Sequence, residues 1–592
     1  MTRPPGVPRK KPEPRRRVAE ARQNATRHHG TRPSLSLSPT TLRNEIGVPS
    51  MVNAWPTPPE SATRTAPNTS DSARSFYLGS TSYASVFAGE EPLSNALSEQ
   101  PPPSTNGTPT IVASGLEAAR HCRMTTGSLV ISKCEQFEFL ERLVISYFSM
   151  NQASAMIGPL ILSALPQIRR DLDYIASQCD NPYPLLAEIT KNSCQPLKVP
   201  PTMLPSEFHS LWTGPNLRWE ALGLVMVLAA SSAQFSPPDD PLFVLANGDR
   251  VNKDDFIEDM IHATNDCITL CQVHGAVNDI MVWLLYNNML VQSNFYGDNY
   301  HGVWRRTSDT ISALHAEGIH CENAVVSPSE EPIFLREARR RMYAAVYRTD
   351  KSLADFFGRP PMIHRRYSDR GLPLDLDDEV VASDDPSVVN DAISKLDTDG
   401  WATDNQIRPA SWIRLRLRLG YVKERFLEAS LAGKKQDFII EEIEAIREDH
   451  RLNWETSPAH LKYDSYDLEA VWRTLKPRTA LRMIGAYLDH LHAGFQIQRL
   501  LRRHTQTALP ALLEIAMNLL STALIFNKNR NHEYNVQRHF ATLVLFYCLP
   551  SAGVLALELR RCTLENVPLP STVSRADIIR NLSVLISIFS EG

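Results

Sequence analysis

The sequence predicts an all-α protein, an extended array of stacked helices behind a disordered N-terminal region. Three observations support this prediction. Apolar residues recur at helical spacing from about residue 111 onward, few stretches alternate like a half-buried strand, and 17 of the 42 prolines lie in the first 110 residues. Because roughly 480 residues of short helices cannot share one bundle core, we expect stacked helix pairs.

Length and composition narrow the class of protein. A chain of 592 residues is too long to fold around a single compact core. Because 43% of its residues are hydrophobic and 22% are charged, most of the chain can bury a core and fold. The net charge of −4 excludes a uniformly basic nucleic-acid coat. Nine cysteines, an odd number, favour reduced intracellular thiols over a disulfide framework.

Neither a secretory signal nor a membrane span is expected. The N-terminus is basic and broken by prolines, without the apolar core of a signal peptide. The nearest candidate span, residues 541–557, is interrupted by Pro550 and Ser551, so we expect a pair of core helices there and no membrane partner.

The first part of the chain divides into an arm and a linker. Residues 1–32 contain ten Lys and Arg against two Glu, a balance of 10 − 2 = +8. Residues 1–75 lack periodic apolar positions and are predicted to be a disordered, basic, Pro/Ser-rich arm. Residues 76–112 contain a short aromatic island and a proline linker, and 113–592 form the predicted helical domain.

Two basic clusters stand in the arm, and they consist of Arg9, Lys10 and Lys11 and of Arg15, Arg16 and Arg17. Such clusters bind phosphate groups or the acidic groove of an import receptor. Nuclear import is the predicted role. Non-specific DNA contact that weakens with salt, and a solubilising tail, are the alternatives.

Helix patterns are clear in three segments. In 301–318, apolar or methyl-bearing residues recur on one face, and Gly318 follows the last turn, where glycine suits a C-cap. The segment from Pro332 has one apolar stripe and stops at Gly358-Arg359-Pro360-Pro361. In 438–447, isoleucines face inward and Glu and Arg face outward.

One stretch imitates a strand. Residues 414–419 alternate Arg and Leu as a half-buried strand would, yet no neighbouring run offers a partner strand. Pro409-Ala410-Ser411 is typical of a helix start, so we predict a helix there.

Three charged or metal-like patterns have ordinary structural explanations. Cys267, Cys271 and His274 share one helical face, but zinc would need a fourth ligand, so we predict core packing. His490 and His492 lie two apart on a predicted helix and therefore on different faces. Residues 375–404 contain ten acids and one Lys and are predicted to be an exposed acidic loop, whose Asp397-Thr398-Asp399-Gly400 lacks the closing glutamate of a calcium site.

The run Arg339-Arg340-Arg341 precedes Asp350 by two to three helical turns. One hypothesis is a clamp for an anionic effector. The favoured hypothesis is pairing with acidic groups on adjacent helices, which locks the array.

Residues 332–378 resemble the signature of a known family. The ordered set is Glu337-Ala338-Arg339-Arg340-Arg341-Met342-Tyr343, then Tyr347, Asp350, Leu353, Gly358-Arg359-Pro360-Pro361, Leu372-Pro373 and Asp375-Leu376-Asp377-Asp378. This resembles the fungal-specific regulatory domain, or middle homology region, of fungal binuclear zinc-cluster transcription factors. Ala344 replaces a usual aromatic residue and Lys351 a usual arginine. Upstream, Leu222-Gly223-Leu224-Val225, Gly297-Asp298 and Trp304 also agree with the family pattern.

The resemblance implies a nuclear regulator of RNA polymerase II transcription. It assigns a signature role to Glu337, Arg340, Arg341, Asp350, Gly358, Arg359 and Pro360. Of the roles common in the family, specialised-metabolite gene clusters are favoured over nutrient use. The six-cysteine zinc module of the family is not visible, since the first cysteine is Cys122 and no C-x2-C pair occurs. No cofactor is therefore expected in this chain. Zinc would be expected only if a zinc-cluster segment upstream is missing from the sequence.

The expected partners follow from the same observations. They are DNA, bound weakly or through a partner transcription factor, the transcription machinery, and a second copy of the chain in a homodimer. The alternative class is a DNA-independent co-regulator or interaction scaffold. The sequence contains no G-x-S-x-G, Walker, G-x-G-x-x-G or H-E-x-x-H motif in a suitable context, so no enzymatic activity is expected.

Overall fold

The structure is a computed structural model of the 592-residue chain. It describes residues 109–150, 154–178, 182–237, 239–245, 247–272, 277–322, 331–431, 436–466, 471, 475–528 and 543–590. The chain divides into two units, Met1–Thr69 and Ser70–Gly592, and every described residue belongs to the second. The predicted boundaries at residues 75 and 112 stay predictions.

Helices make up nearly all regular structure of the described part, which confirms the all-α prediction. The first half contains α1 (Pro109–Ser132), α2 (Phe137–Met150), α3 (Gly158–Leu162), α4 (Leu165–Ser177), α5 (Tyr183–Ser193), α6 (Trp219–Phe235), α7 (Lys253–Gln272), α8 (Asp279–Tyr296), α9 (His301–Ala316) and α10 (Ile333–Phe357). The second half contains α11 (Asp378–Val381), α12 (Pro386–Ser394), α13 (Pro409–Leu431), α14 (Gln436–Glu455), α16 (Pro477–His504), α17 (Leu509–Lys528), a π-helical turn (Val544–Cys548), α19 (Leu549–Leu564) and α20 (Arg575–Ser590).

Short 3₁₀ turns and two bridges complete the regular structure. The 3₁₀ turns are Pro205–Leu211, Gly214–Asn216, Pro241–Phe243, Arg365–Tyr367, Ala459–Leu461, Tyr463–Ser465 and Gln506–Ala508. Within the described residues, β-pairing is limited to isolated antiparallel bridges, Val244 with Arg250 and Leu396 with Ala402.

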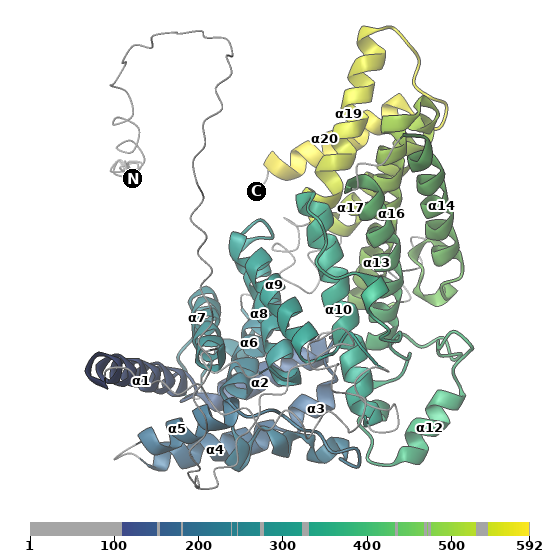
Figure 1. The fold of residues 1–592 in the computed structure, drawn as a ribbon. Helices are drawn as coiled ribbons and strands as arrows, with labels where there is room; N and C mark the ends of the chain where they lie inside the picture. Colours follow the sequence, from purple (N-terminus) through teal and green to yellow (C-terminus); the bar gives the residue numbers. More distant parts are fainter. Residues whose placement is uncertain are drawn as a thin grey trace, which may run out of the picture. The chain divides into compact units, whose positions relative to one another are not determined.

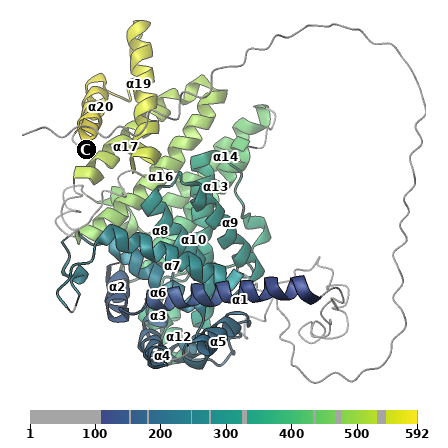
Figure 2. The ribbon, with the colours of Figure 1, turned by 90° about the vertical axis from the view of Figure 1, so that its left-hand side faces the viewer.

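Helix α6 is the centre of the first core. It is apolar on all sides, and every residue from Trp219 to Gln234 is buried, as expected for a helix surrounded by others. It contacts α2, α7 and α8 (Figure 1). A Cβ on Gly223 would lie 2.9 Å from Cys267 Cβ and 3.0 Å from Leu284 Cδ2, so this glycine allows α6 to approach α7 and α8 closely. Figure 2 shows α1 crossing α7 on the outside of this group.

The helices stack by successive contacts. Helix α10 packs on α13, α13 contacts α14 and α16, α16 contacts α17, and α17 contacts α19 and α20 (Figure 1). A second core is built mainly from α16, α17, α19 and α20, and a third, smaller one lies between α13, α14 and α16. Separate cores joined by shared helices are what stacked pairs produce.

The three predicted helices are confirmed. In α9, Val303, Thr307, Ile311 and Leu314 are buried, and Gly318 takes a left-handed φ of 74° just beyond the helix. Helix α14 covers 438–447 and buries its isoleucines at 439, 443 and 446.

The alternating stretch 414–419 lies inside α13, as predicted. Leu415, Leu417 and Leu419 are all buried because α13 is covered by α10, α14 and α16 on different sides. Arg414 is buried too, and its guanidinium is satisfied in part by a hydrogen bond that it donates to the Pro373 carbonyl at 2.6 Å. A helix enclosed in this way loses the usual one-sided pattern.

The prediction of an exposed acidic loop at 375–404 is wrong in part. The segment contains α11 and α12, and Asp375 is only 1% exposed. Its carboxylate accepts hydrogen bonds from Ser411 Oγ at 2.6 Å and the Ala402 N–H at 3.2 Å. Burial raises the pKa of Asp375. Asp397 accepts the N–H groups of residues 399 and 401, and its carboxylate therefore closes a turn.

The expected pair of helices in 541–557 is also wrong. From Leu543 the chain forms one π-helical turn that continues directly into α19, and the missing N–H of Pro550 falls in the first turn of α19. Among the described residues, the helix long and apolar enough to cross a bilayer is instead Gln506–Ile525. Its Leu513, Ala516 and Leu520 are buried in the second core, and 44% of its apolar window is buried.

Candidate functional site

The signature segment 332–378 centres on α10. The helix begins after Pro332 and ends at Gly358, where the sequence predicts its end. Gly358 takes a left-handed φ of 63°, which suits glycine at a helix C-terminus. The chain then folds back along α10 and passes α13. The charged side chains of α10 make the contacts between these segments.

Arg339 joins α10 to α8 and to the end of α9. Its guanidinium forms ion pairs with Asp279 at 2.8 Å, Glu317 at 3.0 Å and Glu331 at 3.0 Å. Burial and the adjacent Asp279 raise the pKa of Glu317 to about 8, while Arg339 opposes the rise. The cation therefore stands among three partly or fully buried carboxylates.

Arg340 and Glu337 form the next part of the network. Arg340 pairs with Glu322 and, at 2.7 Å, with Glu337 on its own helix. The other oxygen of Glu337 accepts the Leu374 N–H at 2.8 Å, and Glu322 accepts the Gly371 N–H at 2.8 Å. Glu337 is fully buried, and burial raises its pKa despite Arg340.

Arg341 anchors the returning segment. It is fully buried and pairs with Asp378, the first residue of α11. It also donates to the Leu376 carbonyl at 3.0 Å. One side chain thereby binds both the backbone and a carboxylate of residues 376–378.

Asp350 fixes the turn after the helix. It is buried, accepts the N–H groups of Met362 and Ile363 at 3.0 Å each, and pairs with Lys351 at 2.8 Å. Lys351, which replaces the usual arginine, also donates to the Ile363 carbonyl and lies 3.3 Å from Glu424 on α13.

Gly358, Arg359 and Pro360 form the exposed corner of the turn. The guanidinium of Arg359 lies 4.6 Å from the centre of the Phe357 ring and 4.9 Å from that of Trp304. These cation–π contacts attach the corner to α9.

A buried network connects α10 with the C-terminal helices. Asp489 of α16 pairs with Arg348 of α10 at 3.2 Å and with Arg416 of α13 at 3.4 Å, and it accepts the Tyr547 hydroxyl at 2.9 Å. Burial alone would raise the pKa of Asp489, but the two arginines hold it well below its usual range.

The arrangement has a clear chemical consequence. Arg339, Arg340 and Arg341 each have a carboxylate partner on another segment, as the structural hypothesis for this run expected. An anionic effector would have to displace these carboxylates. The contacts therefore suit a scaffold that fixes helix geometry and do not suit an effector clamp.

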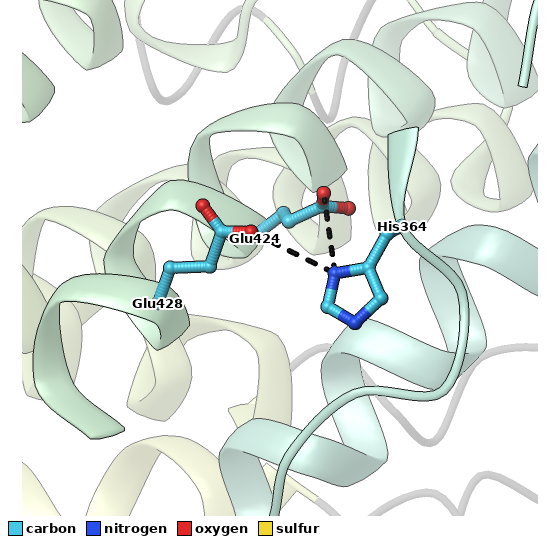
Figure 3. A group of neighbouring side chains, drawn as sticks. All are labelled: His364, Glu424 and Glu428. Carbon is cyan, nitrogen blue, oxygen red and sulfur yellow. Dashed lines mark ion pairs between the residues drawn. The ribbon is translucent and has the colours of Figure 1, made fainter. Parts of the chain in front are cut away.

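Figure 3 shows a further cluster, in which Glu424 and Glu428 of α13 point toward the His364 ring. His364 Nδ1 lies 3.9 Å from Glu424 and 3.6 Å from Glu428. Such a donor set can bind a transition metal. However, Glu424 already accepts the Tyr347 hydroxyl and pairs with Lys351. A metal would have to compete with these bonds, so the cluster fits a metal poorly and we assign none to it.

The thiols expected in the core are there. Cys267 and Cys271 are buried in α7, and Cys271 Sγ lies 3.3 Å from Glu220 Oε2. Burial raises the pKa of both thiols. His274 lies outside the described residues.

The two histidines of α16 do face different surroundings. His490 stacks on His450 with ring centres 4.2 Å apart, whereas His492 Nδ1 lies 3.6 Å from Asp355. The basic clusters Arg9 to Lys11 and Arg15 to Arg17 lie outside the described residues, and their role stays a prediction.

Sequence reasoning missed the acidic partners of α10. They come from α8, from the end of α9 and its following segment, from α13 and from α16: Asp279, Glu317, Glu322, Glu331, Glu424 and Asp489. No local pattern marks them. The available signal was indirect, because a buried run of arginines requires carboxylates elsewhere.

The fold and site thus describe an all-α scaffold whose signature helix is locked by ion pairs. The chain is similar to the pyrrolocin cluster transcription factor fsdR of Fungal sp. (strain NRRL 50135), with 20% identity over 435 residues, which are 68% of this chain and 54% of that protein. This chain therefore spans about half the length of that relative. The similarity supports a relationship to fungal transcription factors. No protein-family profile matches the chain, and no solved structure matches it significantly.

Proposed function

We propose that the chain is a fungal nuclear transcription regulator that controls RNA polymerase II transcription of a specialised-metabolite gene cluster. The similarity over 68% of the chain to a cluster transcription factor carries this proposal. The ordered signature supports it independently, because the family pattern continues in order from Glu337 on α10 to Asp378 at the start of α11.

In this proposal the helical part regulates by contact and performs no enzymatic step. The chain beyond residue 32 is acidic, since subtracting the +8 of residues 1–32 from −4 leaves −12 for residues 33–592, which include the helical part. That charge repels a DNA duplex. We therefore propose that the helical part contacts the transcription machinery, a second copy or a partner factor, and that DNA is reached through the basic arm, a partner factor or a zinc module upstream.

Gene deletion with transcript profiling, combined with chromatin immunoprecipitation of the tagged chain, tests this proposal. The expected result is promoter occupancy at a group of neighbouring genes whose transcripts change in the deletion strain. A control strain carries an untagged copy at the same locus.

Unchanged transcripts in the deletion strain under every condition in which the gene is expressed contradict the proposal. Occupancy that disappears when another DNA-binding factor is removed supports the co-regulator instead.

A further inference from the structure

A pocket of about 300 Å³ lies between α13 and α14. Arg365, from the turn that follows α10, completes its wall. This volume is at the lower end of the range for ligand sites in proteins. The pocket is separate from the ion pairs of Arg339, Arg340 and Arg341, because none of those residues lines it.

The pocket has an excess of positive charge. Three arginines line it, and the acidic residue among its lining residues, Asp449, pairs with Arg425. Among the described residues, Arg365 and Arg418 have no carboxylate within 4 Å. Two guanidinium groups therefore remain without a paired anion.

Arg418 is the pocket arginine whose charge is partly desolvated and, among the described residues, unpaired. Its guanidinium is partly buried and donates to the neutral Thr456 Oγ1 at 2.8 Å. Burial lowers the pKa of Arg418, and Asp399 opposes this effect only from beyond ion-pair distance. A partly desolvated cation without a paired anion is destabilising, so an anion in the pocket would offset that cost.

The remaining wall defines the rest of the ligand. Tyr421, Val422 and Leu452 provide apolar surface, and the Arg365 guanidinium lies 4.0 Å from the centre of the Tyr421 ring. Asn453 Nδ2 donates to the Arg418 carbonyl at 2.7 Å, while its Oδ1 is buried and accepts no hydrogen bond in the structure. A ligand with an apolar body and a hydrogen-bond donor matches these groups.

We propose that this pocket binds a small organic oxyanion, a carboxylate or phosphate monoester with an apolar body, between Arg365 and Arg418. The guanidinium groups of these residues bind the oxyanion. The apolar wall contacts the body of the ligand. This inference goes beyond the proposed function and does not depend on it, because binding is measured on the purified chain.

Ligand-observed NMR on the full chain, at constant ionic strength, tests the proposal. The probes are benzoate and phenyl phosphate, and neutral benzamide has the same ring without the charge. We expect saturable binding of at least one anion and none of benzamide up to about 10 mM. The stronger anion identifies the ligand as carboxylate or phosphate.

Two variants localise the binding. Arg418→Met and Arg365→Met should each weaken the anion at least about tenfold, a loss of about 1.4 kcal/mol. The matched control is Arg366→Met, which removes an exposed neighbouring arginine that does not line the pocket. Arg365 is exposed, so its variant tests the site even if Arg418→Met disturbs folding.

The melting temperature gives a second readout. Arg418→Met should leave the melting temperature of the unliganded chain unchanged or higher, because it removes an uncompensated charge. The proposal is overturned if neither anion binds saturably, if benzamide binds as well, or if both pocket variants bind like the original chain.

Discussion

At the scale of single residues, the charged side chains of α10 act through partners distant in the sequence. Arg341 is 37 residues from Asp378, and Arg348 is 141 residues from Asp489. A buried pair of this kind contributes little net stability, but removing one member leaves an uncompensated charge. Truncation should therefore cost much more than at an exposed pair.

Arg341→Met tests this expectation. The change removes the cation that pairs with Asp378 and the donor to the Leu376 carbonyl, at a cost of about 3–5 kcal/mol, and leaves Asp378 with the Gly158 N–H. Arg447→Met, at an exposed pair with Glu444, is the control and should cost less than about 1 kcal/mol. Denaturant unfolding followed by circular dichroism compares them, and equal losses contradict a structural role for Arg341.

His450 makes stability depend on pH. It is buried, stacks on His490, and its Nε2 lies 3.0 Å from the His490 carbonyl. Burial lowers the pKa of His450 to about 4 from an ordinary value of 6.5. Between these two values the unfolded chain binds the additional proton, so acidification through this window destabilises the folded protein.

His450→Gln should accordingly reduce the loss of melting temperature between pH 6.5 and pH 4.5, because glutamine does not titrate there. Parallel thermal melts of the two proteins across this range measure the difference. Identical pH profiles would show that other groups dominate the acid sensitivity.

At the scale of elements, helix ends are determined by local backbone chemistry. Gly358 has φ 63° and open space where a Cβ would lie, so its substitution by alanine meets only backbone strain. Gly553 lies within α19, also with open space around it. The same substitution therefore has opposite expected effects at these two positions.

Gly358→Ala should destabilise the protein by about 1–2 kcal/mol, the cost of a left-handed conformation for a residue with a Cβ. Gly553→Ala should stabilise it by about 0.5–1 kcal/mol through helix propensity. Thermal unfolding of the two variants measures whether each substitution raises or lowers the stability of the folded protein. A stabilised Gly358→Ala protein would contradict the left-handed helix end.

At the scale of the whole molecule, the basic arm and the acidic helical part have different expected roles. The arm has a balance of +8 and two basic clusters, while the remainder has a balance of −12. An arm of this charge attracts phosphate and import receptors, and the acidic part does not add to DNA attraction.

Nuclear import is tested by changing Arg15, Arg16 and Arg17 together to alanine. A fluorescent fusion of the original chain should concentrate in the nucleus, and the triple variant should shift toward the cytoplasm because it loses half of the clustered cations. Arg305→Ala, which changes a cation of α9 outside the arm, is the control. A triple variant that stays fully nuclear shows that this cluster is not the import signal.

DNA binding of the 592-residue chain should be weak and without sequence preference. We expect Lys and Arg in the arm to contact phosphates only, whereas sequence readout requires side chains placed rigidly in a groove. Binding should also fall steeply with salt. A binding-site selection at physiological salt checks this, and an enriched motif, such as paired CGG triplets, would reveal a DNA-reading element.

The sequence by itself determined the helices, because helix periodicity and helix ends depend on neighbours within a few residues. The stripe of α10, its end at Gly358 and the helix at 414–419 were all predictable in this way. It also indicated that the arginines of α10 need acidic partners. Their identity was not predictable, nor was the burial of Asp375 in a segment that looked like an exposed loop.

Only the tertiary structure decided which groups meet. Because α13 packs against α10, α14 and α16, the three arginines of its alternating run have different surroundings. Arg414 donates to a carbonyl, Arg416 pairs with a buried carboxylate, and Arg418 lines a pocket. Contacts between residues far apart in the chain depend on how helices cross. No local pattern of residues encodes that crossing, which is why the pocket between α13 and α14 could not be seen in the sequence.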